Sequence, residues 1–132
     1  MSTPEFRNEA KTHLERARSF LRAAENNFAL DELIPAGSDA AFAGIRAKDA
    51  ISVMVNDKTI KARHHQDSIA ELEAALDSDP EQSTATDAFA EIINAKNDVQ
   101  YSNKVFERQR ISALIDHARY LVDLAAKTLA QG

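Results

Sequence analysis

The sequence has no cysteine and no tryptophan, and its 132 residues include only three glycines and three prolines. Without cysteine the chain cannot form disulfides, carry thiolate chemistry or build the common zinc frameworks, which suits a reducing cytoplasm. Few glycines and prolines leave few obligatory turns, and abundant alanine reduces the side-chain entropy lost on helix formation. These absences favour a cytoplasmic, all-α protein.

Long apolar runs are also missing from the chain. The longest are a few residues, far short of the roughly 20 that cross a membrane as a helix. The first residues lack the apolar core of a signal peptide. We therefore expect no membrane contact. The net charge is −5, so the molecule as a whole does not attract nucleic acid and any such contact must be local.

The apolar residues that are present recur at spacings of three and four in five segments. They predict helices over about 4–27, 39–56, 69–76, 84–101 and 111–129, because the segments are too long and too regular for strands. Pro35 and Gly37 predict a break before the second helix. That helix is apolar on nearly every side, which is typical of a central position. A chain of this length fits a single domain spanning residues 1–132.

Mostly short connections between these helices predict an up-and-down bundle of about five helices. If direction alternates, two joins meet at one end and make it basic. That end gathers Lys58, Lys61, Arg63, His64, His65, Lys104, Arg108 and Arg110. The opposite end gathers Asp31, Glu32, Asp77, Asp79 and Glu81. We therefore expect a bundle that is polarised in charge.

The fourth predicted helix carries a lysine within its apolar stripe. At about 100° per residue, Phe89, Ile92 and Val99 share one face, and Lys96 falls near its middle. One interpretation lays the lysine stem along that face with its ammonium in water. The other pairs Lys96 with Asp49, which interrupts an apolar face of the second helix. Such a structural polar pair would specify register more than stability.

The sequence offers no recognisable catalytic or metal-binding set. It has no phosphate-cradling glycine loop, no glycine-flanked serine and no cysteine to pair with histidine. His64 and His65 are adjacent and would point about 100° apart on a helix, and Asp67 nearby does not complete a coordination shell. His13 and His117 lie within helical patterns. We expect no metal and no cofactor.

Three segments carry a resemblance to a known superfamily. Residues 43–50 (AGIRAKDA) fall on the buried second helix, His65 starts the third, and residues 96–101 (KNDVQY) end the fourth. In this order the chain resembles a HEPN-like helical domain, particularly the small bacterial versions. The resemblance implies a compact helical bundle that commonly forms homodimers. It also implies a superfamily that includes both metal-independent endoribonucleases and inactive members.

The active members of that superfamily carry an arginine followed, after four to six residues, by a histidine. The positions that match here are Lys96, Asn97 and Tyr101. Lysine lacks the forked donor geometry of arginine, and tyrosine is a poor proton shuttle at neutral pH beside histidine. The resemblance therefore argues against cleavage and leaves a phosphate contact open. Asn97 and Tyr101 could equally anchor the join to the last helix.

The expected function is that of a non-catalytic binding or regulatory module that contacts RNA or a nucleotide at its basic end. Its expected ligand-binding residues are Lys96, Asn97, Tyr101, Arg63 and His65. One alternative is a metal-independent endoribonuclease or toxin of the same superfamily. Another is an antitoxin-like or structural protein-interaction module. Expected partners are a second copy of the chain and a nucleotidyltransferase-like protein.

Overall fold

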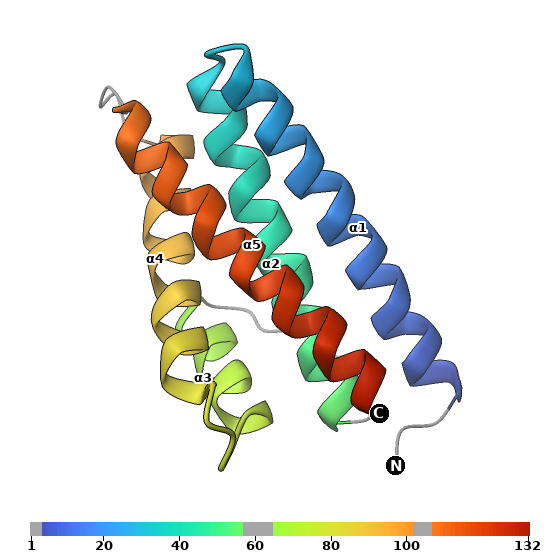
Figure 1. Ribbon diagram of the computed structural model, residues 1–132. Helices are drawn as coiled ribbons and strands as arrows, with labels where there is room; N and C mark the ends of the chain where they lie inside the picture. Colours follow the sequence, from blue (N-terminus) through green and yellow to red (C-terminus); the bar gives the residue numbers. More distant parts are fainter. Residues whose placement is uncertain (1–3, 57–64, 102–106) are drawn as a thin grey trace.

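The computed structural model describes residues 4–56, 65–101 and 107–132, and within these ranges it is all-α (Figure 1). The described helices are α1 (Pro4–Ala29), α2 (Leu33–Asn56), α3 (His65–Ala75), α4 (Gln82–Tyr101) and α5 (Arg108–Gln131). They pack as a bundle, so the predicted fold class is confirmed. No helix in the described ranges is long and apolar enough to cross a membrane.

The turn between α1 and α2 is shorter than the sequence predicted. Asp31 has a positive φ of 60°, and the N–H groups of Asp31 and Glu32 donate to the carbonyls of Phe28 and Asn27 at 3.0 and 2.8 Å. This is a Schellman end to α1. α2 then begins at Leu33, not near residue 39. Pro35 lies in its first turn, where a missing N–H costs nothing because that group has no partner within the helix.

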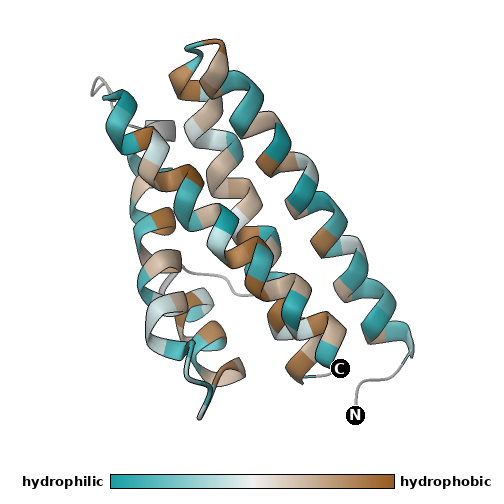
Figure 2. Cartoon of the chain, viewed as in Figure 1, coloured by the Kyte–Doolittle hydropathy of each residue, from teal (hydrophilic) through white to brown (hydrophobic). Residues whose placement is uncertain are grey.

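α2 forms the centre of the bundle. Figure 2 shows pale and brown colours along most of α2, whereas α1 is largely teal. The buried residues of α2 are Ala36, Gly37, Ala40, Ala41, Ala43, Gly44, Ala47, Lys48, Ala50, Ile51, Ser52, Val53 and Met54. Many of these are small, which lets neighbouring helices approach closely. A Cβ added at Gly44 would lie 2.5 Å from Cδ1 of Ile92 on α4.

Contacts between the helices fix their directions. Arg7 near the start of α1 hydrogen-bonds the carbonyl of Gly132 at the end of the chain, and Glu25 near the end of α1 pairs with Arg119 of α5 at 3.1 Å. α1 and α5 are therefore antiparallel. α4 is antiparallel to both α5 and α3, as Figure 1 shows. α3 consequently runs in the same direction as α2, which breaks the alternation that the sequence suggested.

The prediction that the bundle has one basic end and one acidic end is wrong. Arg108, predicted at the basic end, pairs with Asp31, predicted at the acidic end, at 2.8 Å. Because α3 runs parallel to α2, α5 begins beside the turn between α1 and α2. Lys58, Lys61, Arg63 and Lys104 lie outside the described residues.

Candidate functional site

The residues expected to bind a ligand are described to different extents. Lys96 is half-buried and Asn97 is exposed, both in the last turns of α4. His65 and Tyr101 are the first residue of α3 and the last of α4, and their side chains lie outside the described part of the structure, as does Arg63 as a whole. The structure therefore positions only Lys96 and Asn97 of the expected set.

Lys96 lies against an aromatic pair. Its Nζ is 5.7 Å from the centroid of the Phe42 ring on α2, within the range of a cation–π contact. The Phe42 ring packs in turn against Phe20 of α1, with centroids 5.3 Å apart and planes inclined by 32°. All three side chains are half-buried. A cation and two rings thus connect α4, α2 and α1.

Asp49 and Lys96, expected to pair with each other, have different partners in the structure. Asp49 lies 3.4 Å from Nζ of Lys48, whereas Lys96 lies over Phe42. Asp49 is seven residues beyond Phe42 in the sequence, which is about 10 Å further along α2 at 1.5 Å per residue. The helical periodicity predicts that Asp49 and Lys96 face the core. It does not determine how far along the bundle axis each residue lies.

Among the described residues, the most deeply buried charge is that of Lys48, which the sequence pattern did not indicate. The Lys48 side chain is only 2% exposed, and its Nζ lies 2.7 Å from Oε2 of Glu71 on α3. With Asp49 at 3.4 Å, two carboxylates surround one ammonium. A buried charge needs such partners, because desolvation costs several kcal/mol for an unpaired ion, roughly. This cluster connects α2 to α3 and is a structural feature of the bundle.

A polar group one turn beyond Lys48 is also buried. Ser52 is 0% exposed, and its hydroxyl oxygen has no hydrogen-bond partner among the described residues. The available sequence signal for both residues is that α2 has no polar side. A charged or polar residue in such a helix is placed close to the core.

His13 on α1 forms another polar contact with α2. A guanidinium N–H of Arg46 lies 3.1 Å from its Nδ1, and since guanidinium can only donate, Nδ1 accepts. The neutral ring then carries its hydrogen on Nε2, which lies 3.9 Å from Oε1 of Glu9. Burial lowers the pKa of His13 below 6.5, and Arg46 acts in the same direction while Asp49 opposes it.

The lowered pKa of His13 predicts a pH dependence of stability. Below pH 6.5 the unfolded chain takes up a proton that the folded chain resists, so stability present above pH 6.5 is lost as the pH falls toward the folded pKa. The loss cannot exceed about 1.4 kcal/mol per pH unit for one proton. Urea unfolding at pH 7.5 and 5.5 should therefore show a smaller loss for His13→Asn than for the wild type. Equal losses would contradict this role.

Tyr120 of α5 is not a candidate proton donor at neutral pH. Its hydroxyl donates to the carboxylate of Glu81, just before α4. Burial, followed by the hydrogen bond to Glu81, raises the pKa of Tyr120. The phenol consequently stays protonated and holds the turn between α3 and α4 against α5.

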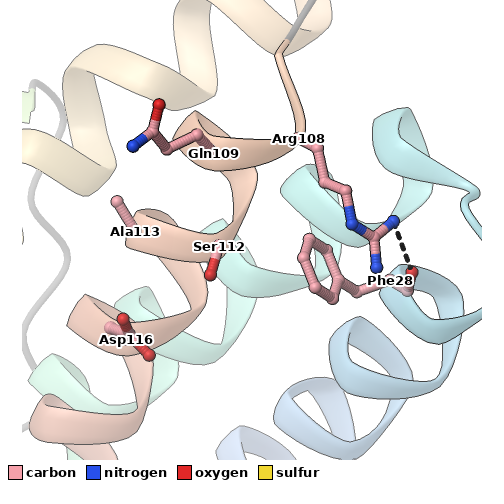
Figure 3. Close-up of a pocket in the computed structure, with 6 residues that line it drawn as sticks. All are labelled: Phe28, Arg108, Gln109, Ser112, Ala113 and Asp116. Carbon is pink, nitrogen blue, oxygen red and sulfur yellow. Dashed lines mark hydrogen bonds between the residues drawn. The ribbon is translucent and has the colours of Figure 1, made fainter.

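A shallow open groove lies where α1 ends and α5 begins. It has a volume of about 580 Å³ and is lined by Phe28, Arg108, Gln109, Ser112, Ala113 and Asp116. Figure 3 shows the Arg108 guanidinium beside the Phe28 ring and bonded to the Phe28 carbonyl, at 3.3 Å. Arg108 also pairs with Asp31. Its charge is therefore already matched, which makes the groove a poor anion site.

The described residues contain no group of three or more histidine, aspartate or glutamate side chains that could hold a metal ion. The sequence matches no known protein family and no curated protein. Among the expected ligand-binding residues, Lys96 and Asn97 are the two whose side chains the structure describes.

Proposed function

We propose that the protein is a non-catalytic, HEPN-like binding or regulatory module that contacts RNA or a nucleotide through Lys96 and Asn97. The supporting observation is that the Lys96 ammonium lies over an aromatic ring, while Lys48 and Arg108 lie against carboxylates. Unlike a carboxylate, the uncharged Phe42 ring does not neutralise the positive charge of Lys96. A phosphate can therefore still gain a charge-assisted contact there.

The residues around Lys96 favour binding over catalysis. An amide such as Asn97 can donate and accept hydrogen bonds but does not transfer protons at neutral pH. The position that matches the superfamily histidine is Tyr101, and a tyrosine of ordinary pKa is seldom ionised at pH 7. A metal-independent endoribonuclease or toxin is the alternative function, and these positions do not carry the histidine of the active superfamily members.

Replacing Lys96 tests the proposed contact. We expect Lys96→Ala to weaken binding of a fluorescent 12-nucleotide single-stranded RNA by about tenfold and to reduce the salt slope by roughly 0.7, because one phosphate contact is lost. Fluorescence anisotropy at several salt concentrations measures both. Lys11→Ala, which removes an exposed lysine from α1, is the matched control and should bind as the wild type does. Equal affinity of the wild type and Lys96→Ala would refute the contact.

A second candidate function is protein interaction. Leu30 and Ile34, at the turn between α1 and α2, are 73% and 62% exposed, and they flank Asp31, the partner of Arg108 at the groove. Exposed apolar side chains of this size often mark a contact surface. They support a homodimer, or an antitoxin-like complex with a nucleotidyltransferase-like protein. Sedimentation equilibrium of the purified chain distinguishes a homodimer from a monomer that awaits another partner.

A further inference from the structure

We infer that Phe42 is a stacking platform for a base of single-stranded RNA, with Lys96 and Arg46 beside it to receive backbone phosphates. The inference rests on the proposed RNA contact of Lys96 and adds a binding site for a base of the same RNA. The supporting observations are that the Lys96 ammonium lies over the Phe42 ring and that Arg46 follows Phe42 by one turn of α2. That combination is how proteins commonly hold single-stranded nucleic acid.

The Phe42 ring is held in place and its side chain is half-buried. Phe20 of α1 packs against it at a centroid distance of 5.3 Å, which fixes the ring orientation. The Nζ of Lys96 lies 5.7 Å from its centroid, and the lysine side chain is half-buried. A lysine ammonium keeps contact with water wherever it can, so the ring face beneath it is reached from the solvent side.

The charges around Phe42 are unequal on its two sides along α2. Arg46 lies one turn beyond the ring, and its contact is with the neutral, accepting Nδ1 of His13. Asp39 lies one turn before the ring and accepts a hydrogen bond from Asn27 at 2.9 Å. The phosphates would therefore approach Phe42 from the side of Arg46 and Lys96, because Asp39 repels them from the other side.

Binding would exchange one contact of Lys96 for another. A half-exposed cation–π contact is weaker than a charge-assisted contact with phosphate. The ammonium can therefore move from the ring to a phosphate and free the ring face for a base. A benzyl ring has no hydrogen-bonding groups, so stacking should show little base preference. Duplex RNA is excluded because its bases are already stacked inside the helix.

The experiment pairs a protein variant with a ligand variant. Phe42→Leu removes the ring and keeps most of the apolar volume, and a 12-nucleotide RNA with abasic positions removes the bases and keeps the phosphates. We expect Phe42→Leu to weaken binding of ordinary RNA by about tenfold, and we expect the wild type to lose a similar factor with the abasic RNA. Phe42→Leu should bind the two RNAs equally.

Phe28→Leu is the matched control, because Phe28 also has a cation over its ring, the guanidinium carbon of Arg108 at 4.0 Å. It should leave the affinity unchanged, and thermal unfolding should show that both variants are folded. If Lys96→Ala weakens binding but Phe42→Leu does not, the stacking platform is refuted and the phosphate contact stands. If the wild type binds no RNA, the proposed function itself fails. If Phe42→Leu instead changes the sedimentation mass, this face is a protein contact and the inference is overturned.

Discussion

Replacing Glu71 with leucine should destabilise the protein by about 3 kcal/mol, because it leaves a buried ammonium without its closest carboxylate. Lys48 is 2% exposed, and Glu71 lies 2.7 Å from its Nζ. The remaining carboxylate, Asp49, is further away at 3.4 Å and cannot offset the loss. Urea unfolding followed by circular dichroism gives the change in the free energy of unfolding from the shift in midpoint.

Two further variants separate the ion pair from a general effect of altering α3. Glu73→Leu changes an exposed carboxylate of the same helix and should shift stability by at most about 0.5 kcal/mol. The double variant Lys48→Met with Glu71→Leu removes both charges and should recover most of the lost stability, as buried pairs replaced by apolar residues often do. A double variant as unstable as Glu71→Leu would show that the pair is not the cause.

Gly44→Val should destabilise the protein by about 2 kcal/mol through overpacking between α2 and α4. A Cβ at position 44 already lies 2.5 Å from Cδ1 and 3.2 Å from Cγ2 of Ile92, and valine adds two more carbons. Ile92 is 0% exposed, so its side chain has little space into which it can move. The better helix propensity of valine offsets only about half a kcal/mol.

A double-mutant cycle identifies the contact responsible. Ile92→Ala alone should cost about 3 kcal/mol through the cavity it leaves. In that background the valine at position 44 enters empty space, so the double variant should be more stable than the sum of the single changes predicts, by at least about 1 kcal/mol. If the changes in the free energy of unfolding of the two single variants simply add in the double variant, α2 and α4 do not meet at this pair of residues.

The fold class could be predicted because the apolar residues of each helix repeat at helical spacing along the sequence itself. The start of α2 was placed too late because Pro35 is a helix breaker in an interior and harmless in a first turn. The direction of α3 could not be predicted at all. It depends on contacts between different helices, such as that of Lys48 on α2 with Glu71 on α3, which are 23 residues apart, and no local pattern encodes them.

The candidate site was predicted in part. Lys96 stood out because it interrupts an apolar stripe, but its aromatic neighbour on α2 depends on how far α4 is shifted along the bundle. Lys48 was overlooked because it lies in a helix that is apolar on nearly every side, and its partner Glu71 is 23 residues away in another helix. Periodicity predicts which face of a helix is buried. Predicting a polar contact also requires knowing where along the bundle axis the two partners lie.

We have proposed that the protein binds RNA at Lys96 without cleaving it. The most direct measurement incubates end-labelled single-stranded RNA with enough protein to saturate the anisotropy change, then recovers the RNA and measures its length on a denaturing gel. We expect a salt-sensitive complex with the wild type, full-length RNA after recovery, and a weaker complex with Lys96→Ala. Shortened RNA whose appearance depends on Lys96, or the absence of any complex with the wild type, would contradict it.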